Sequence, residues 1–329
     1  MNDNSQRQLG LNGPGVFPVG FGCFNIAGGY GCADNDEAIA AVRAAIDAGV
    51  TLFDTADFYG AYSNESVLAR ALGRDIREVT VSTKAGVLLK ADGSLSFDAR
   101  PATIKTSCEA SLRRLGVEVI DLYLLGRVDK TVPIEETIGA FGDLVIAGKV
   151  KNIGLCEVSA ATVRKAHAVH PISAVQNSYS LLDRSAEADL LPTLKELKIA
   201  LMAYSPLGRG LLSGSVVAGQ AFEASDFRSY VPMFAGENLI ANINQAKKLA
   251  NVAKRLGVHT ATLALAWLLA KDASIVPIPG TRKSAHVQTN VAASALSITD
   301  AVVAELDVLF PLGAANGDRY PEFLMSALA

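Results

Sequence analysis

Cysteine is scarce in this chain of 329 residues and follows no metal-binding or disulfide pattern. The four cysteines are Cys23, Cys32, Cys108 and Cys156. No two of them form a C-x-x-C pair, which argues against a zinc ribbon and a disulfide framework and fits a reducing cytosol. The His, Asp and Glu residues also lack a ligand spacing such as H-E-x-x-H, so we expect no metal site.

An excess of positive charge and a long apolar run are missing as well. The formal net charge is −3 and the pI is near 5.9, so the chain lacks the basic footprint of a nucleic-acid-binding domain. The apolar run 260–270 is far too short to span a bilayer. The first ten residues are polar and lack the apolar stretch of a signal peptide. We therefore expect a cytoplasmic protein without nucleic-acid or membrane partners.

Short apolar runs alternate with longer amphipathic segments along most of the chain. Of all residues 50% are hydrophobic and 19% are charged, which is ample for a large buried core. The runs are β-branched or aliphatic at successive positions, as expected of strands buried on both faces of a sheet. The eight strand candidates are 15–21, 51–54, 79–82, 119–124, 153–155, 173–176, 200–203 and 274–278.

The segments between these runs predict helices. Asp34–Ala48 begins with acidic residues and ends before Gly49, and Arg100–Leu115 carries Pro101 in its first turn and ends before Gly116. Further helices are predicted at 134–147, 159–169, 187–197, 242–256 and 260–269. This alternation predicts parallel βα units, and eight of them in this length predict one (β/α)8 TIM barrel domain over residues 1–329. A doubly wound open sheet is the alternative.

Two segments rich in glycine lie outside this alternation. Residues 10–22 predict a hairpin that closes the N-terminal end of the barrel. The glycines between 20 and 31 do not read G-x-G-x-x-G after a strand with an acidic residue about 20 positions on, which argues against a dinucleotide fingerprint. Residues 207–241 are the longest stretch without periodicity and predict a long loop over a functional site.

Polar residues stand at the ends of successive predicted strands. Asp54 ends the second strand, Lys84 ends the third, and Tyr59 lies in the loop after Asp54. Because the carboxyl ends of barrel strands surround the active site, these side chains are expected to meet. Gly126 follows the fourth strand. The sixth and seventh strands end at Gln176, Asn177, Tyr204 and Ser205.

An aspartate, a tyrosine and a lysine together suit proton donation to an oxygen while hydride arrives at the adjacent carbon. A phenol with a pKa near 10 is a weak acid at neutral pH, and a nearby ammonium is expected to lower that pKa. Asp54 would keep Lys84 charged and oriented. General acid catalysis by Tyr59 would contribute about 10²–10⁴-fold in rate. The alternative is a structural ion pair between Asp54 and Lys84, with Tyr59 as a surface residue.

Six ordered segments make the chain resemble the aldo-keto reductases, in particular their bacterial and plant-type branch, over nearly its whole length. They are Phe-Asp-Thr-Ala-Asp-Phe-Tyr-Gly (53–60), Ser-Thr-Lys (82–84), Asp-Leu-Tyr-Leu-Leu (121–125), Val-Gln-Asn (175–177), Tyr-Ser-Pro-Leu-Gly-Arg-Gly (204–210) and Ile-Pro-Gly-Thr-Arg (278–282). The resemblance implies a (β/α)8 barrel that binds NADPH or NADP+ at the carboxyl end of its strands. It also implies reversible reduction of an aldehyde or ketone to an alcohol.

The resemblance further implies roles for single residues. Tyr59 would be the proton donor, with Asp54 and Lys84 as its support. Gln176 would hold the nicotinamide carboxamide, and Tyr204 would stack on its ring. The other cofactor contacts would be Cys156 beside the nicotinamide, Ser205, Leu207, Gly208 and Arg209 at the pyrophosphate, Pro279, Gly280, Thr281 and Arg282 at the adenosine 2′-phosphate, and Gln288 and Asn290 near the adenine.

Two positions depart from the family pattern. A histidine that orients the substrate carbonyl normally stands where this chain has Gly126. Either Tyr59 acts alone at a reduced rate, or water or a substrate group fills the space, or the barrel has lost carbonyl reduction. Loss of one oriented donor costs about 10²–10³-fold in rate. The second departure is Cys156-Glu157 in place of a common Ser-Asn, and cysteine is a weak hydrogen-bond donor.

An NADPH-dependent reductase of a small carbonyl substrate is therefore the leading interpretation. The alternatives are an NADPH-binding sensor or accessory subunit, and a reaction without net redox change on the same barrel, which the glycine at 126 motivates. Asp57, Phe58 and Tyr62 are expected to line the pocket mouth together with residues 207–241. The sequence does not specify an oligomeric state.

Overall fold

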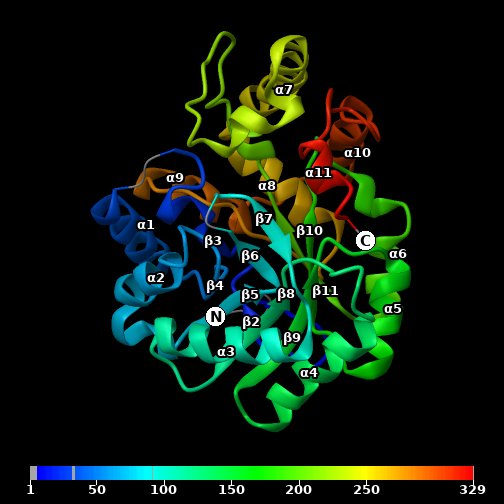
Figure 1. Ribbon diagram of the computed structural model, residues 1–329. Helices are drawn as coiled ribbons and strands as arrows, with labels where there is room; N and C mark the ends of the chain where they lie inside the picture. The colour runs from blue at the N-terminus through cyan, green and yellow to red at the C-terminus, as the bar shows by residue number, and fades with distance from the viewer. Residues whose placement is uncertain (1–5, 32–33, 91, 329) are drawn as a thin grey trace.

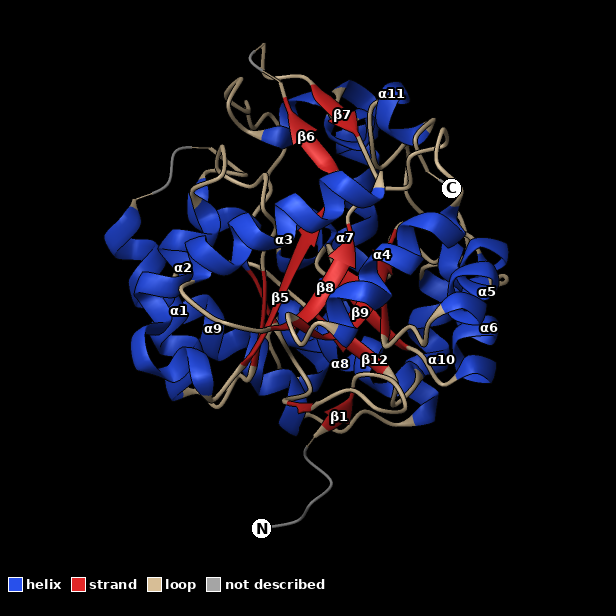
Figure 2. Ribbon diagram, turned by 60° about the horizontal axis from the view of Figure 1, so that its bottom comes forward, coloured by secondary structure: helices blue, strands red, loops and turns tan. Residues whose placement is uncertain are grey.

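The computed structural model describes residues 6–31, 34–90 and 92–328, so Cys32 lies outside the described residues. One sheet of eight parallel strands has the order β12-β11-β10-β9-β8-β5-β4-β3, and helices surround it (Figure 2). The strands are β3 (Phe21–Gly22), β4 (Leu52–Asp54), β5 (Thr80–Ala85), β8 (Ile120–Leu125), β9 (Val150–Cys156), β10 (Ala174–Ser178), β11 (Ala200–Tyr204) and β12 (Ile275–Pro277).

The sheet closes on itself between its first and last strands. The Gly20 N–H donates to the Pro277 carbonyl at 2.9 Å, and the Gly22 N–H donates to the Pro279 carbonyl at 3.2 Å. A Cβ on Gly22 would lie 2.7 Å from the Ile278 carbonyl oxygen, so a larger residue would force these two segments apart. The fold is therefore the predicted (β/α)8 barrel and not an open sheet.

Side chains fill the barrel on both faces of its strands. Leu52, Leu122 and Met202 belong to a buried cluster inside the barrel, whereas Phe53 and Tyr123 belong to the larger core between strands and helices. Burial on both faces explains why the strands read as unbroken aliphatic runs in the sequence.

Most helices lie between strands in the chain, whereas the last three follow the final strand, and the helices lie outside the strands in space (Figure 1). They are α1 (Asn35–Asp47), α2 (Asn64–Leu72), α3 (Pro101–Leu115), α4 (Ile134–Ile146), α5 (Ala160–Val169), α6 (Leu190–Leu197), α7 (Gly236–Leu256), α8 (Thr260–Lys271), α9 (Ser284–Val291), α10 (Asp300–Leu309) and α11 (Glu322–Met325). The Asp34 carboxylate accepts the Asp36 N–H at 2.7 Å and so caps α1. Pro101 begins α3, and Gly116 ends it at a φ of +68°.

A hairpin closes the N-terminal end of the barrel, but it lies earlier in the chain than predicted. Strand β1 (Arg7–Gln8) pairs antiparallel with β2 (Gly15–Val16) at the end of the barrel opposite to β6 and β7 (Figure 2). Leu9 and Val16 are fully buried in the interior cluster. The predicted strand 15–21 is wrong as one element, because its first residues belong to this hairpin and its last residue begins β3.

The carboxyl end of the barrel carries structure that periodicity does not predict. Strand β6 (Val87–Leu89) pairs antiparallel with β7 (Leu95–Phe97) in a hairpin after β5. The predicted loop 207–241 contains three 3₁₀ helices, η5 (Gly208–Ser213), η6 (Phe227–Tyr230) and η7 (Pro232–Phe234), and the first turns of α7. Residues 207–235 contain neither a strand nor an α-helix, so the predicted long loop is present there, and only its last residues belong to α7. The short 3₁₀ turns escape prediction because they have no 3.6-residue repeat. Helices α2, α9 and α10 are likewise absent from the predicted segments.

Candidate active site

A buried ion pair stands at the carboxyl ends of two neighbouring strands. The Lys84 Nζ lies 2.7 Å from Asp54 Oδ2, and both side chains are only 4% exposed. Lys84 also donates to the Thr55 carbonyl at 2.6 Å. The other oxygen of Asp54 accepts from Ser82 Oγ at 2.9 Å and from Gln176 Nε2 at 2.8 Å. The aspartate is thus saturated with donors, and it holds the ammonium of Lys84 in a single place.

Tyr59 lies beside this pair in the turn after β4. The Lys84 Nζ is 5.2 Å from the centre of the Tyr59 ring. The ring packs edge-on against Phe24 and Phe58, with centroids 5.1 and 4.8 Å away. The predicted grouping of Asp54, Tyr59 and Lys84 is therefore present in the structure.

The protonation of Tyr59 differs from the expectation. Burial raises the pKa of the phenol above its ordinary value of 10, and the lowering effect of Lys84 is the smaller of the two. For Lys84 itself, burial is the largest single effect and lowers the pKa, but the contributions of Asp54, Tyr59 and Cys156 together outweigh it and the net pKa is raised. The phenol is consequently neutral and the ammonium charged at neutral pH. The expected lowering of the phenol pKa is wrong for the protein alone, because the effect of burial exceeds that of Lys84.

Gly126 continues from β8 next to Lys84, and the space around it is narrow. Its N–H donates to the Ala85 carbonyl at 2.7 Å. A Cβ at this position would lie 3.1 Å from the Ala85 carbonyl oxygen and 3.1 Å from Val87 Cγ2. Val87 begins the hairpin β6–β7. The hairpin therefore occupies part of the volume that a side chain at position 126 would need.

Cys156 and Gln176 face this site from adjacent strands. They are register partners in β9 and β10. Burial raises the pKa of the Cys156 thiol to about 12, with Lys84 opposing that shift. A thiol with this pKa is neutral at physiological pH and is a poor nucleophile. The Gln176 amide donates to Asp54, so the residue expected at the nicotinamide also supports the ion pair.

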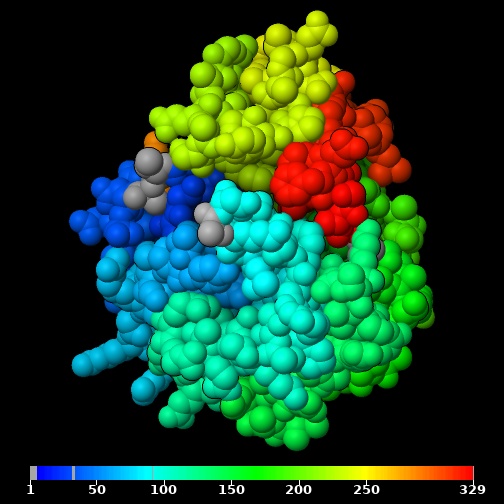
Figure 3. Space-filling model, in the orientation of Figure 1, coloured from blue at the N-terminus to red at the C-terminus, as the bar shows by residue number. Residues whose placement is uncertain are grey.

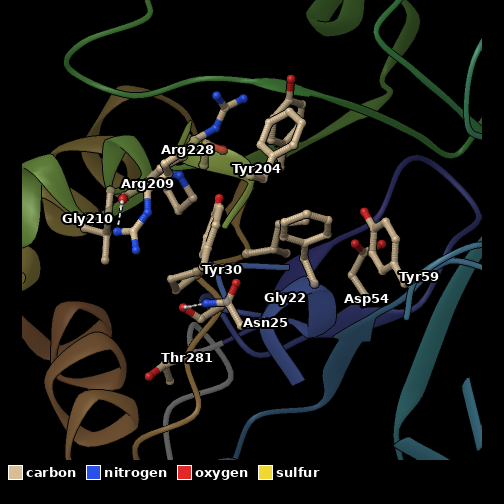
Figure 4. Close-up of a pocket in the computed structure, with 18 of the residues that line it drawn as sticks. Gly22, Asn25, Tyr30, Asp54, Tyr59, Tyr204, Arg209, Gly210, Arg228 and Thr281 are labelled. Carbon is tan, nitrogen blue, oxygen red and sulfur yellow. Dashed lines mark hydrogen bonds between the residues drawn. The ribbon is translucent and has the colours of Figure 1, made fainter. Parts of the chain in front are cut away.

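All these groups line one cavity of about 500 Å³. Asp54 and Tyr59 lie together at one side of it, and Arg209, Arg228 and Thr281 lie at the other (Figure 4). The predicted site residues that line it are Asp54, Tyr59, Lys84, Gly126, Cys156, Gln176, Tyr204, Ser205, Leu207, Arg209, Pro279, Gly280, Thr281, Arg282 and Asn290.

Two residues predicted as cofactor contacts do not line the cavity. Gly208 is buried with a φ of +56°, and a Cβ there would lie 2.9 Å from Leu182 Cδ1. Its contribution is to the backbone of the turn rather than to the cavity wall. Gln288 is exposed on α9, and His286 and Thr289 of the same helix line the cavity instead. The helix periodicity turns Gln288 outward, which a linear motif does not reveal.

The turn after β11 is held in unusual backbone conformations. Ser205 and Arg209 have φ values of +49° and +55° although neither is glycine. Such conformations are strained and cluster at functional sites. Arg209 donates to the Arg319 carbonyl, and its guanidinium lies 4.9 Å from the centre of the Tyr320 ring. The turn thereby presents a cation to the cavity.

Several residues that line the cavity are not indicated by any pattern in the sequence. Tyr30, Arg228 and Tyr320 line the cavity and come from three distant segments. The Tyr320 hydroxyl lies 2.8 Å from the Tyr204 hydroxyl. The C-terminal segment that carries Tyr320 packs against the segment before α7 and beside the hairpin β6–β7 (Figure 3). No motif in the sequence connects these segments.

Of the three residues expected at the pocket mouth, only Phe58 lines the cavity. Asp57 is 2% exposed and does not belong to the cavity wall. Tyr62 accepts a hydrogen bond from the Leu89 N–H at 3.2 Å and lies outside the cavity wall too. The prediction for Asp57 and Tyr62 is therefore wrong, because the turn after β4 directs them to other sides of the chain.

The described residues contain no group of three or more His, Cys, Asp or Glu side chains that could hold a metal ion. Among the helices of the described part of the chain, none combines the length and the hydropathy needed to cross a membrane.

Comparisons with known proteins agree with one family. The model of the "Aldo/keto reductase family" matches residues 18–310. "Probable aldo-keto reductase 1" of Glycine max is 40% identical over 315 residues, which cover 95% of this chain and 91% of that protein. The structure of a glycerol dehydrogenase from Gluconobacter oxydans is similar with a TM-score of 0.85 and 27% identity, covering 94% of this chain and 95% of that one.

A further solved structure is an aldo-keto reductase from Klebsiella pneumoniae in complex with NADPH. It has a TM-score of 0.74 and 26% identity, and the match covers 94% of this chain and 96% of that one. The family match and the relative from Glycine max each extend over nearly the whole barrel. This chain belongs to the aldo-keto reductase family.

Proposed function

We propose that this chain is an NADP-dependent oxidoreductase that reduces an aldehyde or a ketone to an alcohol, reversibly. The observation that carries the proposal is the buried pair of Asp54 and Lys84 beside the neutral phenol of Tyr59, at one side of a cavity that carries cations at the other. Membership of the aldo-keto reductase family and the NADPH complex of the Klebsiella pneumoniae relative support this reaction class.

The cavity residues fit NADPH or NADP+, which supplies or accepts the hydride when bound. Phosphate groups need cationic partners, and Arg209, Arg282 and Lys283 line the cavity away from Tyr59. The residues proposed to hold the cofactor are Cys156, Gln176, Tyr204, Ser205, Leu207, Gly208, Arg209, Gly280, Thr281, Arg282, Gln288 and Asn290. The weakest member of this set is Gln288, because it is exposed on α9.

Tyr59 is proposed to donate its hydroxyl proton to the substrate oxygen as hydride adds to the carbonyl carbon. The raised pKa of Tyr59 keeps the proton in place until the oxygen becomes basic. Lys84 then stabilises the phenolate that remains, and Asp54 keeps Lys84 charged and in position. In the oxidation of an alcohol the same phenolate takes the proton back.

Gly126 is proposed to be an adapted feature of this pocket, with Tyr59 as the proton donor without help from a histidine. The tight fit of Gly126 against Val87 supports this proposal, because a Cβ at position 126 would already press on the hairpin. For a substrate that makes no compensating contact, we expect the rate to be about 10²–10³-fold lower than in an enzyme with a second oriented donor.

The test is NADPH oxidation by the purified chain with an activated aldehyde, 4-nitrobenzaldehyde, and with a naphthoquinone. We expect one NADPH to be consumed for each alcohol or quinol formed. Tyr59→Phe should retain NADPH binding, measured by fluorescence titration, and lose turnover. Undiminished turnover in this variant would show that Tyr59 is not the proton donor.

The same assay separates the alternatives. Tight NADPH binding without turnover of any carbonyl by the unmodified chain would favour a sensor or accessory subunit. A product of unchanged oxidation state, formed with catalytic NADP+, would favour a reaction without net redox change. Stoichiometric loss of NADPH counts against both. We further propose that residues 1–329 act as one domain in the cytoplasm on a small-molecule substrate, which the single closed barrel and the scarcity of cysteine support.

A further inference from the structure

Arg127 is a cation of the cavity wall that has no ion-pair partner in the part of the chain that the structure describes. It directly follows Gly126 and lines the cavity together with Tyr320. Its Nη1 donates to the Gly126 carbonyl at 2.7 Å, and its Nη2 donates to the Tyr320 hydroxyl at 3.2 Å. Its Nε is buried and has no hydrogen-bond partner within the described residues. A buried donor without a partner costs free energy, so we expect a ligand to accept a hydrogen bond from it.

Neighbouring arginines are neutralised where Arg127 is not. Arg319 forms ion pairs with Glu157 at 2.7 Å and with Asp183 at 2.6 Å. Arg228 pairs with Asp226 at 2.6 Å. No carboxylate of the described residues lies within ion-pair distance of Arg127. The charge of Arg127 is therefore available to an anion from outside the chain.

The Tyr320 ring lies close both to Arg127 and to Arg209, which also has no ion-pair partner among the described residues. The guanidinium of Arg127 lies 5.6 Å from the centre of the Tyr320 ring, and that of Arg209 lies 4.9 Å from it. Arg209 belongs to the segment proposed to hold the pyrophosphate. Arg127 instead follows Gly126 in the chain, and a Cβ on Gly126 would be 3.7 Å from Lys84 Cβ, so the backbone of Arg127 continues from a residue next to the ion pair.

We propose that Arg127 determines substrate specificity by binding a carboxylate, so that the substrate is an aldehyde or ketone that also carries an acid group. This inference rests on the proposed carbonyl reduction. Nε and Nη2 form one edge of the guanidinium, and a carboxylate that displaces the Tyr320 hydroxyl from Nη2 forms a bidentate pair with that edge. The same pair turns the carbonyl group toward Tyr59. An anchored substrate would thereby be positioned without the histidine that Gly126 replaces.

The experiment compares acids with their neutral esters. The probes are 4-carboxybenzaldehyde and phenylglyoxylate, with the methyl ester of each, because the two pairs differ in the spacing between carbonyl and acid. The proteins are the unmodified chain, Arg127→Gln and Arg127→Lys, each checked for folding by circular dichroism. The readouts are kcat/KM for NADPH-dependent reduction, and calorimetric binding of the same acids and esters to the protein saturated with NADP+. The affinity for NADPH itself is measured for every variant.

We expect the unmodified chain to prefer at least one acid over its ester. In Arg127→Gln that acid should lose about 10–100-fold in kcat/KM and in affinity, the range of one charged hydrogen-bonded contact, while the ester changes little. Arg127→Lys should show a smaller loss than Arg127→Gln, because lysine keeps the positive charge but lacks the paired N–H donors of a guanidinium. Loss of NADPH affinity in Arg127→Gln would overturn the proposal, because it would place Arg127 at the cofactor.

Failure of the carboxylate site and failure of the proposed carbonyl reduction give different results. Esters that are reduced as well as their acids by the unmodified chain would overturn the role of Arg127 and leave carbonyl reduction standing. Equal losses for acid and ester in Arg127→Gln would also overturn it, because they would indicate a structural role. Acids that bind in an Arg127-dependent manner without being reduced would support the carboxylate site and count against the proposed function.

Discussion

The Lys84 ammonium lies 2.7 Å from the Asp54 carboxylate in a place where both side chains are almost fully buried. Removal of one member leaves the other charge buried without a partner. Breaking such a pair costs about 3–5 kcal/mol, whereas replacing both members with apolar residues costs much less. A substitution in this pair therefore tests both the candidate active site and the stability of the barrel.

We expect Asp54→Asn to lower the free energy of unfolding by about 3–5 kcal/mol, measured by urea denaturation. Asp143→Asn is a matched control, since Asp143 forms an exposed pair with Lys105, and it should change the free energy by less than about 1 kcal/mol. Similar small effects in both variants would show that Asp54 is not the partner that keeps Lys84 charged.

The reduction rate should not depend on the ionisation of Tyr59 at ordinary pH. Burial raises the pKa of Tyr59 above its ordinary value, so the phenol keeps its proton throughout the range from about pH 6 to 9. We expect kcat for reduction of 4-nitrobenzaldehyde to be level over that range. A fall of kcat with a midpoint near pH 7 to 8 would mean that the phenol pKa is lowered in the working complex, as the sequence alone predicts.

Asp57 is expected to destabilise the fold at alkaline pH. Burial, with a further contribution from Glu65, raises the pKa of Asp57 to about 7, and its Oδ1 has no hydrogen-bond partner among the described residues. A carboxyl with a raised pKa in the folded state stabilises the fold below its ordinary pKa near 4, and this stabilisation is lost as the pH rises through 7. The Asp57→Asn substitution removes the charge that is unfavourable above that pH.

We expect Asp57→Asn to raise the free energy of unfolding by about 1–3 kcal/mol at about pH 8 and to change it little at about pH 4.5. Urea midpoints at the two pH values measure the difference. Asp92→Asn serves as the control, because Asp92 is on the surface and should show no such gain. An equal effect of Asp57→Asn at both pH values would refute the raised pKa.

Introducing the family histidine at position 126 should not improve this enzyme. A side chain there meets the Ala85 carbonyl and Val87, so we expect Gly126→His to lower the free energy of unfolding by about 1–3 kcal/mol. NADPH consumption should not rise above that of the unmodified chain with either the activated aldehyde or the quinone. If Gly126→His turns over substrate and the unmodified chain does not, the glycine at position 126 marks the loss of a hydrogen-bond donor.

Local patterns were sufficient for much of the fold. Seven of the eight strand runs predict strands correctly, and so do the acidic start of α1, Pro101 at the start of α3 and Gly116 at its end for their helices. Each of these signals depends on neighbours within a few residues. The grouping of Asp54 and Lys84 also follows from the sequence, since parallel strands bring their carboxyl ends to one side. Short 3₁₀ turns and the hairpin β6–β7 escape such patterns.

The sequence by itself determined the barrel, the family and the ordered polar residues at the strand ends. Only the tertiary structure decided that the hairpin packs on Gly126, that burial raises the pKa of Tyr59, and that Arg127 contacts Tyr320. The physical reason is sequence separation. Periodicity and motifs report contacts close along the chain. Burial, pKa and the partners of a charged side chain depend on residues that folding brings together from distant segments, such as Arg127 and Tyr320, which are 193 positions apart.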